Sequence, residues 1–109
     1  MRRDDLVVVV SSGDYGKPRP ALVVQADDHA GHPSVTVLPF TSDLHDVPLL
    51  RVTVEPTESN GLRMRSQVMV DKATTIPRAK VGGTIGHLDQ ATMTTTSKAL
   101  AAFLGLTLL

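Results

Sequence analysis

The sequence predicts a mostly β (α+β) domain, built from short strands and closed by one C-terminal α-helix. Short apolar runs rich in Val, Leu and Thr alternate with clusters of Gly, Pro, Asp and Ser along most of the chain, which is typical of strands joined by turns. After Asp89 the spacing of apolar residues changes to that of a helix. A chain of 109 residues has the size of one domain and contains no linker or internal repeat, so residues 1–109 are expected to form a single domain.

Three strands are predicted in the N-terminal part of the chain. Residues 6–10 form a continuous Val-rich run, which is typical of a strand buried on both faces, and residues 21–25 form a second apolar run. Residues 11–20 between them are rich in Gly and Pro and predict a loop. Residues 34–39 alternate between apolar and polar side chains and predict a third strand, which follows a turn-rich connection over residues 27–33.

The middle of the chain predicts two further strands, at residues 49–54 and 67–71, with a turn over residues 56–61 after the first of them. Residues 76–80 predict a single helical turn that begins at a proline. Residues 81–88 contain three glycines, so only a short strand is expected there.

The C-terminal helix is predicted to run from its N-cap, Asp89, through Leu104 and to end at Gly105. Its apolar side chains recur at a helical spacing, so one stripe can lie on the sheet. The stripe consists of Met93, Leu100, Phe103 and Leu104, with Ser97 as its polar member. Residues 106–109 are too apolar for a solvated tail and are expected to pack on the body of the protein or on a second subunit.

Charge and cysteine content exclude several classes of protein and site. The chain carries 11 Lys and Arg residues and 11 Asp and Glu residues, so it lacks the bulk positive charge of a non-specific duplex DNA binder. It has no cysteine, which excludes disulfides and thiolate zinc sites. No segment has the length and apolar character of a signal peptide or a membrane span, so a cytoplasmic protein without membrane contact is expected.

The histidines do not predict a metal site. None of them has a carboxylate partner at a recognised ligand spacing, and they are scattered along the chain at His29, His32, His45 and His87. We therefore expect neither a metal nor a cofactor.

Two short segments carry the residues best suited to bind a phosphate. Arg19 lies between two prolines, which hold its backbone extended, and a guanidinium can donate two hydrogen bonds to a phosphate. Thr41 and Ser42 follow a predicted strand, where their hydroxyls could donate to a phosphate oxygen as negative charge develops on it. An ordinary surface loop at Arg19 and an ordinary turn at Thr41 and Ser42 remain the alternatives.

Further polar residues could support such a site. Lys17, Arg63 and Arg65 could add local positive charge, and Gln67 continues the face on which the two arginines would lie if this segment is extended. Asp71 could act as a general base or orient one of the arginines, although a structural salt bridge explains an aspartate there equally well.

The order of the motifs resembles that of the MazF/PemK (Kid) toxin family. The matching stretches are Gly-x-x-Arg-Pro-Ala-Leu-Val-Val at 16–24, Pro-x-Thr-Ser at 39–42, Gly-Leu-Arg at 61–63, Ser-Gln-Val-x-Val-Asp-Lys-x-x-Thr-Ile at 66–76, and the region from Ile85 through the helix to Gly105. The resemblance covers nearly the whole chain, and the combination is specific although no single motif is.

The resemblance implies a small SH3-like β-barrel with a C-terminal α-helix, of the CcdB/PemK-like type. It further implies a homodimer whose interface forms the substrate groove, sequence-specific cleavage of single-stranded RNA without a metal, and inhibition by a cognate antitoxin. The family's loop arginine corresponds to Arg19, which would stabilise the pentavalent phosphorane and protonate the leaving 5′-oxygen. The family's strand-end threonine corresponds to Thr41, which would hold a non-bridging oxygen while the 2′-hydroxyl attacks.

Two departures from the family pattern bear on the chemistry. Asp71 matches the acidic residue to which PemK-type members assign a base or positioning role, but Met69 occupies the position of the arginine that those members carry two residues earlier. Their loop histidine also has no counterpart near Lys17. The chain is therefore expected to use the MazF-type chemistry at Arg19 and Thr41.

Two alternatives remain at this point. A CcdB-like gyrase poison would share the barrel and the dimer, but proteins of that type resemble each other in a C-terminal tryptophan, and this chain has no tryptophan. A barrel with a degenerate site that only binds RNA or an antitoxin is kept open by Met69.

Overall fold

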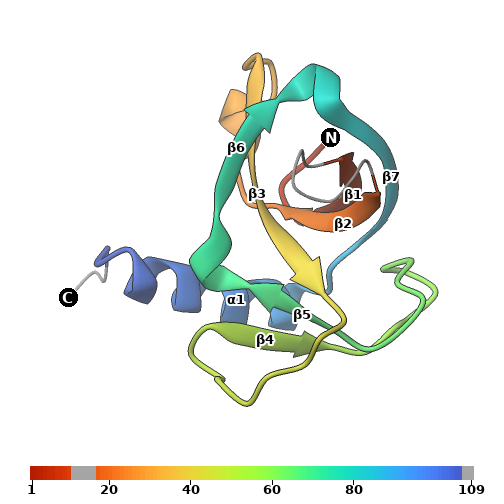
Figure 1. Cartoon of the computed structure of the whole chain (residues 1–109). Helices are drawn as coiled ribbons and strands as arrows, with labels where there is room; N and C mark the ends of the chain where they lie inside the picture. Colours follow the sequence, from red (N-terminus) through yellow and green to blue (C-terminus); the bar gives the residue numbers. More distant parts are fainter. Residues whose placement is uncertain (11–16, 107–109) are drawn as a thin grey trace.

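The computed structural model describes residues 1–10 and 17–106, so parts of the predicted loop 11–20 and of the apolar tail 106–109 lie outside the described residues. A seven-stranded sheet and one C-terminal α-helix make up most of it, which confirms the mostly β prediction (Figure 1). The strands are β1 (Asp5–Val10), β2 (Pro18–Val23), β3 (Ser34–Thr41), β4 (Arg51–Val54), β5 (Ser66–Met69), β6 (Thr74–Pro77) and β7 (Val81–His87). The helices are the 3₁₀ turns η2 (Asp27–His29), η3 (Val70–Lys72) and η4 (Arg78–Lys80), and the α-helix α1 (Gln90–Phe103).

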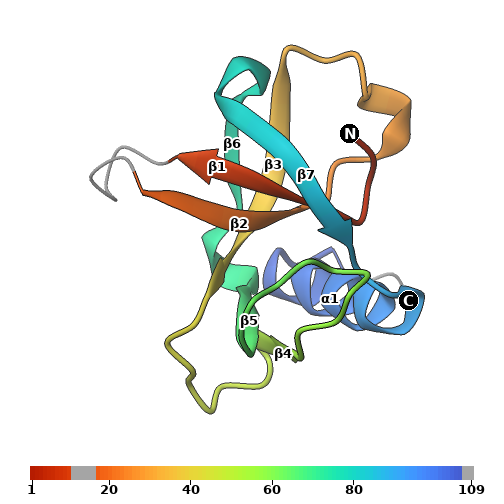
Figure 2. The same cartoon turned by 90° about the vertical axis from the view of Figure 1, so that its right-hand side faces the viewer.

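The sheet is antiparallel and strongly curled. Its strand order is β4-β5-β3-β2-β1-β7, and β6 pairs with β3 outside this path. Strands β6, β3, β2, β1 and β7 curve around one another as a barrel, while β4, β5 and α1 lie together beside one end of it (Figures 1 and 2). The long strand β3 pairs with β2, β5 and β6, so it belongs to both parts of the molecule.

Two hydrophobic cores lie on opposite faces of the same strands, because successive residues of a strand point to opposite sides. In β3, Val35 and Val37 enter the barrel core, and Leu38 and Phe40 enter the core beneath α1. In β1, Leu6 enters the core beneath α1, and its neighbour Val7 enters the barrel core. The predicted burial of β1 on both faces is therefore confirmed for its first residues, whereas Val10 at its end is 46% exposed.

The C-terminal helix begins and ends as predicted. The Asp89 carboxylate accepts a hydrogen bond of 2.9 Å from the Thr92 N–H at the first turn. Gly105 follows the helix with φ of 72°, a left-handed conformation that glycine adopts without strain. Among the described residues no helix is long and apolar enough to cross a membrane.

The predicted apolar stripe of this helix is wrong at its C-terminal end. Met93 is buried and Leu100 packs against the core, but Phe103 and Leu104 are 48% and 51% exposed. Ser97, the polar member of the stripe, accepts a 2.6 Å hydrogen bond from the Arg3 guanidinium. The first turn of the chain is thereby tied to the helix.

The predicted loop 11–20 extends too far, because β2 already begins at Pro18. Pro18 and Pro20 pair with β1 on one side, while the ladder between β2 and β3 runs only from Ala21 to Val23. Proline cannot donate to a ladder and is tolerated where a strand lacks a partner on one side. The sheet therefore opens between the start of β2 and the end of β3, and Arg19 lies in that opening.

Several other element boundaries differ from the predictions, and the second strand ends at Val23, two residues before the predicted end. The third strand continues two residues further, to Thr41, and the fourth begins only at Arg51. The fifth ends at Met69, so Asp71 lies in η3 rather than in a strand. The helical turn predicted at 76–80 is confirmed only at its end, because residues 74–77 form β6 and the turn is η4.

The last strand is longer than predicted despite its glycines. β7 spans seven residues and pairs with β1 through a register that shifts twice. Gly86 allows the chain at residues 59–60 to cross it closely, since a Cβ at Gly86 would lie 2.4 Å from the Ser59 carbonyl oxygen. Glycine weakens a strand in general, but at this position it is required by the crossing.

Candidate functional site

An open cavity of about 560 Å³ lies where the sheet opens between β2 and β3. The segment of residues 61–66 and strand β7 form its other walls. Its polar lining residues are Arg19, Thr41, Ser42, Arg63 and Ser66, and its larger apolar ones are Val8, Pro18, Pro20, Phe40, Leu62, Met64 and Ile85.

The register of β2 and β3 explains why Arg19 and Thr41 meet in this cavity. Ala21 pairs with Pro39, Leu22 with Leu38 and Val23 with Val37, so the two strands run antiparallel in one unbroken register. Continuing the same register by two residues sets Arg19 opposite Thr41, and directly opposite residues of an antiparallel pair project to the same side. Two segments that are far apart in the sequence thus supply a cation and a hydroxyl to one site.

The Thr41 hydroxyl is oriented by the loop that follows it. The backbone N–H of Asp43 donates a 3.0 Å hydrogen bond to Thr41 Oγ1. A hydroxyl has one proton to donate and two lone pairs, so accepting this bond leaves the proton of Thr41 available for an acceptor in the cavity.

The wall opposite β2 and β3 is held in place by Asn60, which is 4% exposed. Its Oδ1 accepts hydrogen bonds of 3.0 Å from the N–H groups of Thr57 and Leu62, and its Nδ2 donates a 2.9 Å bond to the Glu55 carbonyl. This network closes a compact turn that leads into Leu62 and Arg63, both of which line the cavity.

The same turn is seated on β7 through backbone contacts. Gly61 has φ of 72°, and a Cβ there would lie 2.1 Å from the Ile85 carbonyl oxygen, so only glycine fits. The His87 N–H also donates a 2.9 Å bond to the Ser59 carbonyl. The Asn-Gly pair is a recognisable turn signal, but its role as a wall of the site depends on β7 and is not visible in the sequence.

The cavity combines positive charge, hydroxyl donors and apolar walls. Two arginines and the hydroxyls of Thr41 and Ser42 can bind an anion, and no Asp, Glu or His is among the described residues that line it. The apolar side chains beside them, such as Met64 and Ile85, can contact flat apolar groups. The site therefore fits an anion that is linked to flat, partly apolar groups.

Four of the eight candidate residues lie outside this cavity. Lys17 is exposed at the start of β2 and does not line it. The Arg65 guanidinium is bound to Glu55 at 2.6 Å, and Asp71 forms an ion pair with Arg51. Asp71 therefore does not orient Arg19 or Arg65, and of the open possibilities for this residue the structural salt bridge is the one observed.

The pKa of Asp71 reflects this ion pair. Burial of the Asp71 carboxyl raises its pKa, but the hydrogen bond and the positive charge of Arg51 outweigh this effect and hold the pKa below its ordinary value of 3.8. The carboxylate is consequently stable as an anion and is engaged away from the cavity.

The predicted shared face of Arg63, Arg65 and Gln67 is wrong. The chain bends at residues 63–64, before β5 begins at Ser66, so these three side chains do not alternate as in one extended strand. Arg63 lines the cavity, Arg65 is paired with Glu55, and Gln67 is only 5% exposed. The fourth candidate, Gln67, is thus buried and engaged by the protein itself.

Acidic and histidine side chains do not gather elsewhere in a way that would hold a metal. Among residues 1–10 and 17–106, no group of three or more His, Asp or Glu side chains has that arrangement.

Comparison with known proteins places these features in a family context. Residues 2–104 match the model of a family described as PemK-like, MazF-like toxin of type II toxin-antitoxin system. The chain is 45% identical over 107 residues to a protein named probable endoribonuclease MazF from Mycolicibacterium smegmatis, with 97% of this chain and 98% of that protein covered.

Two solved structures share the fold. The Mycobacterium tuberculosis toxin MazF-mt6 gives a TM-score of 0.79 at 26% identity, over 94% of this chain and 99% of that chain. An endoribonuclease in complex with its cognate antitoxin, from mycobacterial species, gives a TM-score of 0.82 at 24% identity, over 100% of this chain and 99% of that chain. These similarities confirm the expected CcdB/PemK-like barrel with a C-terminal helix.

Proposed function

Since the chain belongs to the PemK-like, MazF-like toxin family of type II toxin-antitoxin systems, we propose that it is a metal-independent, sequence-specific endoribonuclease that cleaves single-stranded mRNA. The observation that carries the proposal is the juxtaposition of Arg19 and Thr41 in one open cavity with apolar walls. A phosphodiester between two nucleosides is an anion flanked by flat bases, so it matches the charged and apolar parts of this cavity.

The proposed reaction uses a nucleophile that RNA itself carries. The 2′-hydroxyl attacks the adjacent phosphorus and gives its proton to solvent water, the bond to the 5′-oxygen breaks, and the departing oxygen takes a proton from Arg19, which regains one from solvent. The products are a 2′,3′-cyclic phosphate and a 5′-hydroxyl, and the reaction has no net proton requirement.

Arg19 and Thr41 divide the stabilisation of the transition state between them. The Arg19 guanidinium stabilises the additional negative charge of the phosphorane and protonates the 5′-oxygen, while the Thr41 hydroxyl donates to a non-bridging oxygen. Ser42 and Arg63 line the same cavity and bind the neighbouring phosphate or sugar. Met69 does not line the cavity, so its difference from the PemK-type arginine leaves this chemistry in place.

The partners follow from the family. We propose a single toxin domain over residues 1–109 that forms a homodimer, is inhibited by a cognate antitoxin, and acts in the cytoplasm, where mRNA is translated. The similar mycobacterial endoribonuclease in complex with its cognate antitoxin supports inhibition by an antitoxin. The identity of 45% to a protein named as an endoribonuclease favours RNA cleavage over a CcdB-like action on gyrase.

Cleavage of single-stranded RNA in the presence of EDTA tests the proposal. We expect wild-type protein to produce fragments with 2′,3′-cyclic phosphate and 5′-hydroxyl ends. Arg19→Ala should lower the rate at least about 100-fold while the protein stays folded, because it removes a charge that acts mainly in the transition state. Thr41→Val should lower the rate by a similar order, because it removes the hydroxyl and nearly preserves the shape.

Matched controls separate chemistry from general damage. Arg65→Ala removes an arginine that is paired with Glu55 outside the cavity, and Thr75→Val removes an exposed hydroxyl on β6 that contacts Thr36. Both variants should cleave at nearly the wild-type rate. Full activity of Arg19→Ala, or 5′-phosphate ends on the products, would contradict the mechanism, and RNA binding without cleavage would favour the degenerate barrel.

A further inference from the structure

The loop that follows Thr41 is fastened to the sheet by one buried side chain, Gln67. The His45 N–H donates a 2.9 Å hydrogen bond to Gln67 Oε1, and Gln67 Nε2 donates a 2.9 Å bond to the His45 carbonyl. We call this pair of hydrogen bonds the Gln67 clasp. It gives the loop at residue 45 the two-point attachment that a neighbouring strand would otherwise provide.

Strand pairing places the clasp directly beside Thr41. Gln67 is opposite Thr41 in the β3–β5 ladder and opposite Thr53 in the β5–β4 ladder, so the three side chains form a row on one face. Gln67 Nε2 also donates a 3.2 Å bond to Thr53 Oγ1, which fixes the rotation of the carboxamide. This third hydrogen bond, donated to a neighbour within the sheet, holds the carboxamide in the orientation that the clasp uses.

The clasp holds the loop only two residues after the Asp43 N–H. The loop between the strand end at Thr41 and the fastened backbone of His45 is short: it consists of Ser42, Asp43 and Leu44. Within this short span the Asp43 N–H reaches Thr41 Oγ1 at 3.0 Å, and the Asp43 carboxylate contacts His45 Nε2 at 3.1 Å. Releasing residue 45 would remove the constraint that keeps the Asp43 N–H on the Thr41 hydroxyl.

We infer that Gln67 is a positioning residue for RNA cleavage: through the clasp it orients the Thr41 hydroxyl toward the phosphate, without touching the substrate. This inference rests on the proposed function. Gln67 is buried and does not line the cavity, so its effect passes through the loop backbone. Loss of the clasp should therefore lower kcat, and RNA binding through the two cavity arginines should remain.

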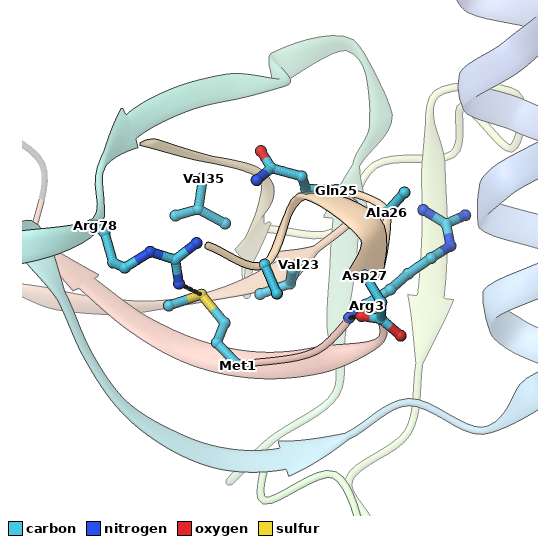
Figure 3. Close-up of a pocket in the computed structure, with 9 residues that line it drawn as sticks. Met1, Arg3, Val23, Gln25, Ala26, Asp27, Val35 and Arg78 are labelled. Atoms are coloured by element: carbon cyan, nitrogen blue, oxygen red, sulfur yellow. Dashed lines mark hydrogen bonds between the residues drawn. The ribbon is translucent and has the colours of Figure 1, made fainter. Parts of the chain in front are cut away.

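A second glutamine offers a matched control at the other end of β3. Gln25 Nε2 donates to the carbonyls of His29 at 3.1 Å and Ser34 at 3.2 Å, and Gln25 Oε1 accepts a 3.0 Å bond from the Thr36 N–H. Gln25 lines a small separate pocket with Arg78 and Met1, which shares no residue with the Arg19 cavity (Figure 3). Both glutamines thus make three hydrogen bonds that connect a strand to the segment outside it, at His45 for Gln67 and at His29 for Gln25. Only the segment at His45 follows Thr41.

The experiment compares Gln67→Met with Gln25→Met, since methionine preserves the side-chain length and removes all three hydrogen bonds. Thermal unfolding and amide hydrogen exchange are measured on each folded protein, together with kcat and KM for a single-stranded RNA. We expect both variants to lose stability, but Gln67→Met alone to lower kcat about 10- to 100-fold with KM changed less than threefold. Exchange at the Asp43 and His45 amides should accelerate at least tenfold in Gln67→Met only.

A third variant, Gln67→Glu, tests the contribution of one bond of the clasp, and the wild type tests the proposed function itself. Gln67→Glu retains the acceptor for the His45 N–H and loses the donor to the His45 carbonyl, so its kcat should lie between those of Gln67→Met and wild type. Equal losses of kcat in Gln67→Met and Gln25→Met, or an unchanged kcat in a folded Gln67→Met, would overturn the positioning role alone. A wild-type protein that cleaves no RNA would overturn the proposed function and the positioning role with it.

Discussion

Asp4 is held in a conformation that costs an aspartate free energy. Among the described residues it alone, glycines apart, has a positive φ, at 78°. Its N–H donates to the Val23 carbonyl at 3.0 Å and its carbonyl accepts from the Leu88 N–H at 2.9 Å, so pairing on both sides keeps the backbone there. The left-handed region is strained for residues with a Cβ, although aspartate tolerates it better than most.

We therefore expect Asp4→Gly to stabilise the protein. Glycine removes the steric strain, and its greater freedom in the unfolded chain offsets part of that gain, so the net change should be about 0.5 kcal/mol. Asp4→Ala should instead destabilise by about 1 kcal/mol, because alanine keeps the Cβ and adapts to this region less well. Urea denaturation measures the free energy of unfolding of both variants and of the wild type. The prediction requires that stability decreases in the order Asp4→Gly, wild type, Asp4→Ala.

At this scale the sequence predicted Arg19 and Thr41 as site residues because their signals are local. Arg19 between prolines and Thr41 at a strand end carry their signal in their immediate neighbours. The roles of Asn60 and Gln67 were not predictable in the same way, because a buried carboxamide has the same sequence signature as a surface one. Their hydrogen bonds to distant backbone decide the difference, and only the fold supplies that backbone.

The ion pair of Arg51 and Asp71 joins two elements, β4 and η3. Both side chains are mostly buried, at 15% and 20% exposure. Met69 lies opposite Arg51 in the β4–β5 ladder, and the arginine is bound to Asp71, two residues further along the chain. The pair thereby fixes the point where β5 turns into η3, beneath the C-terminal helix.

We expect Asp71→Asn to lower the free energy of unfolding by roughly 1–3 kcal/mol at neutral pH, because it leaves the Arg51 guanidinium mostly buried without its counter-charge. Since folding lowers the Asp71 pKa below 3.8, its stabilisation is present above that value and is lost as the pH falls through the folded-state pKa. The variant should therefore lose less stability than wild type when denaturation is repeated at about pH 3.

Glu55→Gln provides the comparison for this prediction. Its ion pair with Arg65 is more than half exposed on both sides, so breaking it should change stability much less. Equal losses in the two variants would show that burial does not distinguish the pairs.

The elements were predicted best where their periodicity is strong. The Val-rich first strand and the capped helix carry such patterns, and the structure confirms both. β6 and most of β7 were missed because their residues are polar, partly exposed or glycine, so no apolar alternation marks them. Those strands form because β3 and β1 offer them unpaired backbone edges, which is a property of the assembled sheet.

For the whole molecule, the exposed end of the C-terminal helix is the surface that we propose a second copy covers. Phe103, Leu104 and Leu106 are 48%, 51% and 63% exposed, and large apolar side chains in a group of this kind mark interaction sites. The predicted stripe is thus apolar except at Ser97, but only Met93 and Leu100 meet the core of the same chain.

We expect the protein in solution to have twice the chain mass of 11.6 kDa. The double variant Phe103→Glu and Leu106→Glu should shift light-scattering mass toward one chain, because charges resist burial in an apolar interface. Leu49→Glu alters a leucine that is 80% exposed on another loop and should leave the mass unchanged. A dimeric double variant would place the interface elsewhere.

Because β7 pairs with β1 and lines the cavity, the cavity cannot be complete during synthesis until β7 has been made. Arg19 and Thr41 precede β7 by many residues, but Ile85 of β7 lines their cavity together with the segment of residues 61–66. A ribosome that adds about 5–20 residues per second reaches Ile85 roughly 2–9 seconds after Thr41. A nascent chain therefore carries both reactive groups well before it can enclose a substrate, because the cavity stays incomplete until β7 has been made.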